Sequence, residues 1–467
     1  MKKVKSLLSL VLAVIMVAGC LVTANAATIS EIEPNNSAAT ATSFNVGDTV
    51  KGKIEADGEK DYFEFKATKT GNATVTIKHL VNEAASTYFT VEVQTKDAEP
   101  RTLATFASAG NKAEENAVLS VDKDESYVVV VKQGDICDAT LEYQISVAIA
   151  TVALAESEPN DSATEADTLE YSPSGTPKEY YGSIGKADKD YYKVTIPSDG
   201  VINLYLYNYA SNAGNYKATL MTYVEVDGVQ EITEITSIEI ADTAESKTGP
   251  SVGVAKGTYY LLIEGIGDSI GSYKTRILFR SVENVETEIN DTLAKADAIS
   301  AGKTYKGTLD SAADKDYFKL TVTADKKNYD FAAKSTKAGD WTFALLTSDG
   351  NKAAEPVVLK ATNDSKEAKA VIEALPAGTY YVAVSVTAGG IHNEDIYEFS
   401  ITEKAEDTET EDKEETPNLL ERIFNLNWGG LWENFSGWIE EINFIGMFAS
   451  FGEAFIYFFT IITSFLG

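Results

Sequence analysis

The chain has 467 residues, of which 71 are acidic and 40 are basic, so its net charge is −31. Phosphate binding needs a basic footprint, and a chain this acidic offers none, so nucleic acid is excluded as a partner. Two cysteines cannot build a disulfide framework, so stability must come from hydrophobic cores.

The first 26 residues have the pattern of a secretory signal peptide. Residues 1–5 are basic, residues 6–22 are apolar, and Ala-Asn-Ala at 24–26 fits a cleavage site. Cys20 ends a Val-Ala-Gly-Cys sequence that resembles a bacterial lipobox, so a lipidated N-terminus at Cys20 is the alternative. In either case we expect a secreted or cell-surface protein.

A pair of motifs occurs three times, about 125 to 130 residues apart. The first motif contains Glu-x-Glu, then Asn, at residues 31–36, 156–161 and 286–291. The second is Lys-Asp-Tyr-Phe or Lys-Asp-Tyr-Tyr, at residues 60–63, 189–192 and 315–318. A unit of this length can bury a core of its own. We therefore expect three similar domains, at residues 27–150, 151–282 and 283–403.

The hydrophobic pattern of each repeat is that of strands. Residues 201–209 alternate, which places Ile202 and its neighbours on one face and tyrosines on the other. Residues 127–131 form a short apolar run typical of a buried strand, and residues 257–263 and 378–384 echo it. Short strands separated by Gly, Asn and Asp clusters favour an all-β protein of antiparallel β-sandwiches.

The chain changes character after the third repeat. Seven of residues 404–418 are acidic, and this stretch is predicted to form an acidic, disordered linker. Residues 419–467 carry an aromatic stripe with helical spacing, which predicts a helical hydrophobic segment. This segment has three open interpretations: membrane contact, self-association or docking of a partner, and a helical hairpin packed on a neighbouring domain.

Together, the repeated elements resemble the bacterial pre-peptidase C-terminal domain. These elements are the acidic first motif, a Gly-x-Ile/Leu segment, the Asp-Tyr motif, and Gly-Thr-Tyr-Tyr before the last strands. The third copy departs from the family pattern at Ile289, and the first departs at Asn36. The resemblance implies three tandem jelly-roll-like antiparallel β-sandwiches that accompany secreted enzymes without catalysing a reaction. Related collagen-binding modules bind calcium through the acidic segment and hold a protein ligand with tyrosines on one sheet face.

The acidic motifs supply the oxygen ligands that calcium prefers. Each repeat offers one set of candidate ligands, which ends with a carboxylate that could complete the coordination shell from just before the Asp-Tyr motif. The three sets are Glu31, Glu33, Asn35, Asn36 and Asp57; Glu156, Glu158, Asn160, Asp161 and Asp188; and Glu286, Glu288, Asn290, Asp291 and Asp314. The alternative is a turn whose side chains bind nearby backbone amides. We expect Asp61, Asp190 and Asp316 to accept backbone donors at such a turn.

Tyr205, Tyr207 and Tyr209 share one face of their strand and are candidates for a ligand-binding surface. The alternative is a face covered by a loop or by the neighbouring domain.

No catalytic constellation emerges from the sequence. Residues 249–253 match the Gly-x-Ser-x-Gly pattern, but we expect them in a loop, without the strand-turn-helix setting or a histidine partner. We predict a non-catalytic, secreted or cell-surface binding or adhesion protein that recognises an extracellular protein or polysaccharide, or assists a separate secreted enzyme. One alternative is a structural spacer whose segment 419–467 anchors to a membrane or drives self-association, and the other is a small hydrolase of unrecognised type.

Overall fold

The computed structural model describes residues 26–404, except 81–85, 137, 174, 210–213, 227–228, 326, 336–338, 362–365 and 390–395. The described residues all belong to one unit of the chain, Met1–Lys404. The predictions for the signal peptide, the acidic linker and the aromatic C-terminal segment therefore fall almost entirely outside the described residues. Within the described part, nearly every regular element is a β-strand.

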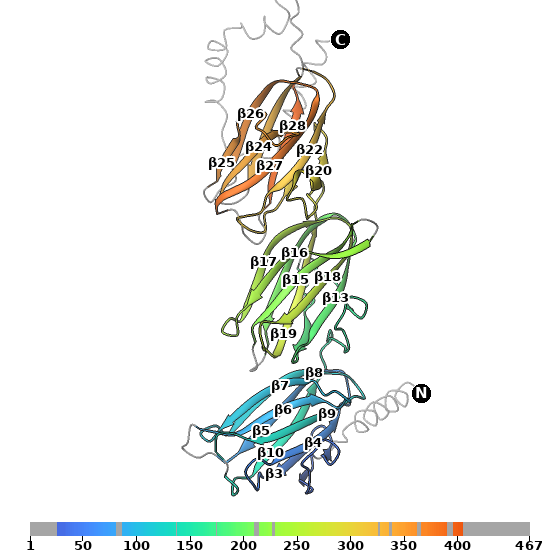
Figure 1. The fold of residues 1–467 in the computed structure, drawn as a ribbon, viewed down its shortest axis with the longest axis vertical. Coiled ribbons are helices and arrows are strands. Elements are labelled where there is room, and N and C mark those ends of the chain that lie inside the picture. The colour runs from blue at the N-terminus through green and yellow to red at the C-terminus, as the bar shows by residue number, and fades with distance from the viewer. Residues whose placement is uncertain are drawn as a thin grey trace, which may run out of the picture. The chain divides into compact units, whose positions relative to one another are not determined.

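The first sandwich consists of two five-stranded sheets (Figure 1). One has the order β1-β3-β10-β5-β8, with strands Thr28–Ser30, Thr49–Gly52, Tyr143–Ala150, Gly71–His79 and Glu114–Val121. The other has the order β2-β4-β9-β6-β7, with strands Thr42–Phe44, Lys60–Lys66, Ser126–Gln133, Thr87–Thr95 and Thr102–Ala109.

The second sandwich repeats this plan. Its four-stranded sheet has the order β12-β19-β14-β17, with strands Tyr180–Ile184, Gly271–Ser281, Gly200–Asn208 and Ser246–Val254. Its five-stranded sheet has the order β11-β13-β18-β15-β16, with strands Asp167–Thr168, Lys189–Ile196, Gly257–Gly265, Tyr216–Val226 and Val229–Ile240.

The third sandwich follows the same order of strands. Its four-stranded sheet is β21-β28-β23-β26, with strands Thr304–Gly307, Tyr397–Glu403, Lys327–Ser335 and Lys366–Leu375. Its five-stranded sheet is β20-β22-β27-β24-β25, with strands Asp297–Ile299, Asp316–Val322, Gly378–Gly389, Gly339–Thr347 and Val357–Ala361. A short 3₁₀ helix, Leu293–Lys295, precedes β20.

Each sandwich closes over its own hydrophobic cluster. The strand that carries the Asp-Tyr motif is paired antiparallel with a strand buried in the middle of its sheet, as β4 is with β9. Residues Val128–Val131 of β9 are all buried because β4 and β6 flank this strand. The short leading strands, such as β2 on β4 and β20 on β22, add in parallel at the sheet edge.

The strand predictions from the sequence are confirmed in their main points. All but the last residue of the alternating segment at 201–209 lie in β14, with Ile202, Leu204 and Leu206 buried in the core. The Gly-x-Ser-x-Gly segment, expected in a loop, instead lies within strand β17. The domain limits at 27–150, 151–282 and 283–403 stay a prediction.

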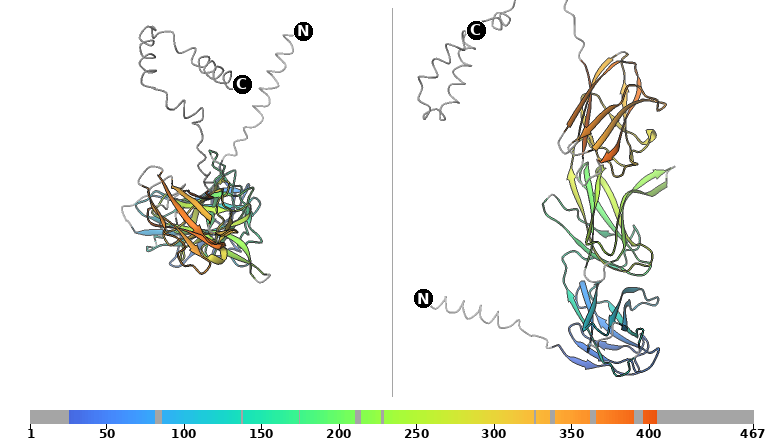
Figure 2. Two further views of the ribbon diagram at one scale, coloured as in Figure 1. Left: turned by 90° about the horizontal axis from the view of Figure 1, so that it is seen from above. Right: turned by 90° about the vertical axis from the view of Figure 1, so that its left-hand side faces the viewer.

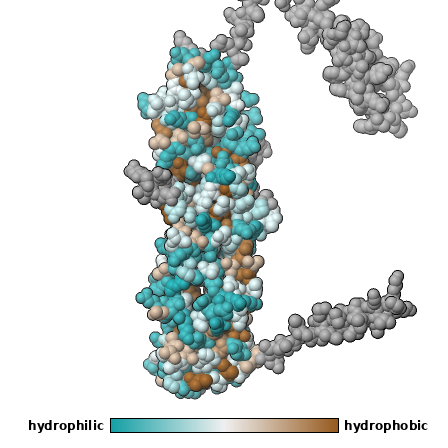
Figure 3. Space-filling view, turned by 90° about the vertical axis from the view of Figure 1, so that its right-hand side faces the viewer, coloured by the Kyte–Doolittle hydropathy of each residue, from teal (hydrophilic) through white to brown (hydrophobic). Residues whose placement is uncertain are grey.

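The surface is mainly polar on the face drawn in Figure 3, where hydrophobic residues form small, separate patches. Across the described residues, no helix combines the length and apolar character that a membrane span requires. The right-hand view of Figure 2 shows the strands of each sandwich from a further direction.

Candidate metal centres

The first acidic motif forms a leading segment in each sandwich, at residues 31–36, 156–161 and 286–291. The backbone carbonyl of its asparagine accepts a hydrogen bond from the backbone amide of the tyrosine in the Asp-Tyr motif. The distance from Tyr62 N to Asn35 O is 2.9 Å, and that from Tyr191 N to Asn160 O is also 2.9 Å. The segment thus lies against the start of the strand that carries the second motif. This contact brings together carboxylates that are about 30 residues apart in sequence.

A buried Glu–Asp–Tyr group lies behind each leading segment. In the second sandwich the Tyr273 hydroxyl lies 2.5 Å from Asp190 Oδ2 and 3.3 Å from Glu156 Oε2. In the third, Tyr397 hydrogen-bonds Asp316, and its hydroxyl lies 3.0 Å from Glu286 Oε2. The tyrosine comes from one sheet and the aspartate from the other, so this group crosses the sandwich.

The first sandwich repeats the group with Glu31, Asp61 and Tyr143. The Tyr143 hydroxyl hydrogen-bonds Asp61, and Lys53 N donates to Glu31 Oε1 at 2.9 Å. Glu156 and Glu286 likewise accept backbone amides, from Ser183 and Thr308. The first glutamate of each motif therefore ties the leading segment to the neighbouring strand.

A glycine in that neighbouring strand makes room for the group. A Cβ added at Gly307 would lie 2.1 Å from the Tyr397 hydroxyl and 2.5 Å from Glu286 Oε2. The equivalent positions, Gly52 and Gly182, meet Tyr143 and Tyr273 at similarly short distances. These are the glycines of the Gly-x-Ile/Leu segment, so their part in the motif is to leave space for the tyrosine and the glutamate.

The expectation that Asp61, Asp190 and Asp316 serve a turn is wrong. Each lies within a strand and is fully buried, with Oδ2 close to a tyrosine hydroxyl. The strand alternation that buries the aromatic residue two positions later also turns the aspartate inward. Sequence reasoning missed the partners Tyr143, Tyr273 and Tyr397, whose only signal was a tyrosine in the last strand of every repeat.

Several buried oxygens in these groups have no hydrogen-bond partner among the described residues. They are Oδ1 of Asn35, Asn160 and Asn290, and Oδ1 of Asp61, Asp190 and Asp316, all on fully buried side chains. Leaving a buried polar atom unpaired costs about 1–3 kcal/mol, more for a charged group. The same atoms are unpaired in all three sandwiches. This recurrence fits a bound cation, because a hard cation is coordinated by the lone pairs of oxygen atoms such as these.

Three groups of carboxylates place their oxygens within 4.8 Å of one another. These groups are Glu31, Glu33 and Asp61; Glu158, Asp161 and Asp188; and Glu286, Glu288 and Asp316. The protein therefore contains acidic clusters that could hold a metal ion, and their donor set of carboxylate and amide oxygens suits a hard divalent cation.

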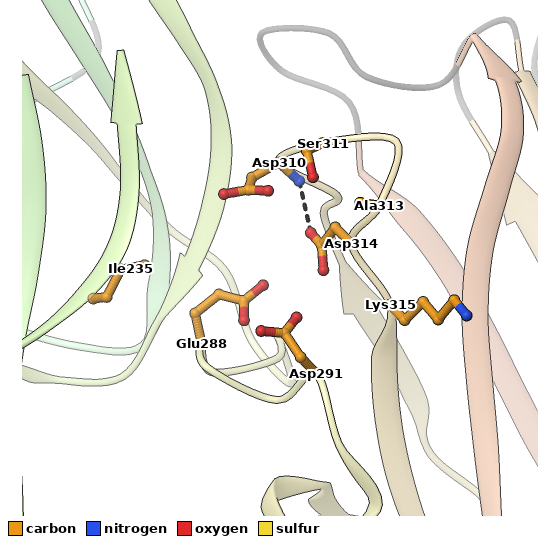
Figure 4. Close-up of a pocket in the computed structure, with 8 residues that line it drawn as sticks. All are labelled: Ile235, Glu288, Asp291, Asp310, Ser311, Ala313, Asp314 and Lys315. Carbon is orange, nitrogen blue, oxygen red and sulfur yellow. Dashed lines mark hydrogen bonds between the residues drawn. The ribbon is translucent and has the colours of Figure 1, made fainter. Parts of the chain in front are cut away.

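The remaining candidate ligands divide into two sets. Asp291 and Asp314 line a pocket with Glu288 in the third sandwich, and Figure 4 shows the three carboxylates turned toward the same space. Asn36 and Asp57 of the first sandwich are exposed. In the first sandwich, Glu59 is the residue equivalent to Asp188 and Asp314. Its carboxylate accepts hydrogen bonds from the backbone amides of Glu55 and Ala56, as that of Asp314 accepts one from the amide of Asp310.

The clusters are short of positive charge. Burial raises the pKa of Glu31 to about 7 and that of Asp61 to about 8. Burial, with Glu286 and Asp314 nearby, raises the pKa of Glu288 to about 10. Desolvation and mutual repulsion both disfavour the ionised forms, and an opposite charge placed among them would reverse this effect.

The second sandwich differs because an arginine reaches its cluster. Arg101, just before β7 of the first sandwich, places Nη1 3.0 Å from Asp188 Oδ1 and Nη2 3.3 Å from Glu158 Oε2. Burial and Asp188 raise the pKa of Glu158 to about 7, against the lowering effect of the guanidinium.

The tyrosine row of β14 lies on the outer face of its sheet. Tyr205 and Tyr207 stack with ring centroids 6.5 Å apart, and Arg276 lies 4.1 Å from the Tyr205 centroid. Lys274 lies 5.1 Å from the Tyr207 centroid, and Tyr209 packs on Tyr181. The three tyrosines of the row are half-buried, so the row presents partly exposed rings beside two cations.

A buried histidine and the serine of the Gly-x-Ser-x-Gly segment both have structural partners. His79 is buried in the first sandwich, with Nε2 2.8 Å from Ser108 Oγ. Ser251 is fully buried in the second, and Asn203 Nδ2 donates to its hydroxyl at 3.1 Å.

Comparisons with known proteins give only remote similarities. No family model and no curated protein matches the chain. Among solved structures, the pre-peptidase C-terminal domain of collagenase from Bacillus anthracis is 26% identical over 23% of this chain and 94% of its own, with a TM-score of 0.18. The tandem CBM22-1–CBM22-2 domain of Xyn10C from Paenibacillus barcinonensis is 13% identical over 49% of this chain and 86% of its own (TM-score 0.18). A triple jelly-roll protein of an archaeal virus is 8% identical over 76% of this chain and 82% of its own (TM-score 0.19).

Proposed function

We propose that this is a secreted or cell-surface, non-catalytic binding protein of three pre-peptidase C-terminal-type sandwiches, of which the first and third are built around a divalent-cation centre. The observation that carries the proposal is the threefold recurrence of a buried Glu–Asp–Tyr group whose asparagine and aspartate oxygens lack partners. Calcium is the ion whose preference for several carboxylate and amide oxygens this donor set meets.

The residues that would hold the ion in the first and third sandwiches are Glu31, Glu33, Asn35 and Asp61, and Glu286, Glu288, Asn290 and Asp316. A bound divalent cation supplies the positive charge that these clustered carboxylates lack. The chain's own residues then hold the leading segment, because Glu31 and Glu286 also accept backbone amides of the adjacent strand.

The cation centres are tested by thermal unfolding of the mature chain with calcium and with a chelator. Calcium at 100 times its Kd should stabilise a folded sandwich by about 2.7 kcal/mol. The paired variants Asp61→Asn and Asp316→Asn should reduce that stabilisation, whereas Asp124→Asn, which removes an exposed carboxylate, should not. Equal melting curves with calcium and with chelator would refute the centres.

The binding surface is the outer face of the sheet that contains β14. Aromatic rings stack on sugar rings or apolar side chains, and Arg276 adds positive charge on a chain of net charge −31, whereas Lys274 is paired with Glu179 at 2.9 Å. This combination favours an extracellular protein or polysaccharide with anionic groups. Three sandwiches in one chain allow weak sites to gain avidity.

The binding proposal is tested by screening the mature chain against matrix proteins and polysaccharides. Retention of at least one ligand is expected, and the double variant Tyr205→Ser/Tyr207→Ser should weaken it at least tenfold. The matched control is Tyr223→Ser, a half-buried tyrosine on β15 of the opposite sheet. Undiminished binding by the double variant would exclude this face, and no retained ligand would exclude the binding function.

A further inference from the structure

The acidic cluster of the second sandwich contains a cation that the chain itself supplies. The Arg101 guanidinium lies 3.0 Å from Asp188, 3.3 Å from Glu158 and 3.7 Å from Asp161. The Asp188 side chain is 0% exposed and that of Arg101 is 28% exposed. All three carboxylates of the cluster therefore share one guanidinium.

Neighbouring contacts hold Arg101 in this position. Lys186 N donates to Thr102 O at 2.8 Å, next to Arg101 in sequence. Glu158 N donates to Asp122 Oδ2 at 3.0 Å, and Ser120 N donates to Ser183 Oγ at 3.0 Å. These bonds join β7 and β8 of the first sandwich to the leading segment and β12 of the second. The backbone around Arg101 is therefore held against the second sandwich, and this fixes the position of the guanidinium.

The equivalent cluster of the third sandwich has no such partner among the residues that line it. Glu288, Asp291 and Asp314 correspond to Glu158, Asp161 and Asp188, and here the second sandwich contributes Ile235 to the lining. Figure 4 shows Lys315 pointing away from these carboxylates. Asp314 is 8% exposed, and its Oδ1 has no hydrogen-bond partner among the described residues.

We propose that Arg101 is the resident cation of the second sandwich: at Glu158, Asp161 and Asp188 it supplies the counter-charge that a divalent cation supplies to the carboxylate groups of the first and third. This inference rests on the proposed cation centres. A guanidinium is permanently charged and offers a planar set of N–H donors to carboxylates, so it neutralises the cluster without a metal. The centre in the second sandwich is therefore latent, and it binds a divalent cation only when Arg101 is removed.

The test measures calcium bound per mature chain by isothermal titration and equilibrium dialysis. Arg101→Ala should bind one more calcium ion per chain than the wild type, and adding Asp188→Asn should abolish the gain. The matched control is Lys132→Ala, which removes the same charge from an ion pair with Glu92 within the first sandwich. Unchanged stoichiometry in Arg101→Ala, or a loss of bound calcium on Asp188→Asn in the wild-type background, would overturn the proposal.

Two further arms separate this inference from the proposed function. If Asp61→Asn and Asp316→Asn leave calcium binding unchanged while Arg101→Ala still gains an ion, the cation centres fail and the latent centre stands. Arg101→Lys keeps the charge and guards against misfolding of the alanine variant; it should gain no ion. A full extra ion in Arg101→Lys would show that charge at this position does not exclude the metal, and the proposal would fail.

Discussion

At the scale of single residues, the site is built from groups that are unfavourable alone. Asp316 is buried against Glu286, and a fully buried carboxyl pair is stable only with shared hydrogen bonds or a counter-charge. Tyr397 provides the hydrogen bond, and Gly307 leaves the space for it. The glycine and the tyrosine are thus as much part of the site as its carboxylates.

Gly307→Ala is expected to destabilise the third sandwich by about 1–3 kcal/mol, because its Cβ would overlap the Tyr397 hydroxyl and the Glu286 carboxylate. Denaturant unfolding of the mature chain measures the change. The control is Gly378→Ala in the same sandwich, where the nearest atom to the new Cβ is 3.5 Å away. Equal losses in the two variants would contradict the packing argument.

The metal-free protein is expected to lose stability as the pH rises from about 4 to about 8. Burial raises the pKa of Glu31 to about 7 and those of Asp61 and Asp314 to about 8, so the folded chain binds protons that the unfolded chain has already released. Stability therefore falls through this range. Melting temperatures in chelator at pH 5 and pH 8 measure the effect.

General repulsion on an acidic chain also grows with pH, so a matched pair of variants is needed. Asp61→Asn should flatten the pH dependence, whereas Asp124→Asn at an exposed position should leave it unchanged. A melting temperature in chelator that rises toward pH 8 would be incompatible with buried carboxyls of raised pKa.

At the scale of elements, the sequence predicted the strands better than the site. Alternation identified β14, and an apolar run identified β9, because both patterns follow from which faces are buried. The acidic motifs were recognised as candidate ligands, but Asp190 was assigned to a turn. Its inward orientation depends on its position within β13, and its partner Tyr273 lies 83 residues away. Arg101 could not be predicted, since its contacts depend on a neighbouring sandwich.

The leading segments are expected to differ in their dependence on calcium. In chelator, residues 31–36 and 286–291 should exchange amide hydrogens faster, because their carboxylates then repel one another without a counter-charge. Residues 156–161 should stay protected, since Arg101 supplies that charge. Hydrogen exchange with and without calcium measures this, with β9 as an internal reference. If the amides of all three segments exchanged faster in chelator to the same extent, Arg101 would not be the counter-charge of the second cluster.

At the scale of the whole molecule, three separate hydrophobic clusters make three units of stability within one chain. A net charge of −31 opposes compaction, and the acidic clusters concentrate part of that charge in buried positions. Local neutralisation at each cluster therefore stabilises the sandwich that contains it. Since the cores do not share side chains, the contributions of distant clusters should add.

Calorimetry of the mature chain should accordingly show more than one unfolding transition, as expected when cores unfold separately. Chelation should lower the transitions of the first and third sandwiches, which Asp61→Asn and Asp316→Asn identify. The transition that chelation leaves in place should be the one that Arg101→Ala lowers, because Arg101 is the only cation that forms an ion pair with Asp188 among the described residues. A single transition that shifts as a whole would instead mean that the three sandwiches unfold cooperatively. Contacts between sandwiches, such as those of Arg101, would then couple the unfolding of one sandwich to that of the next.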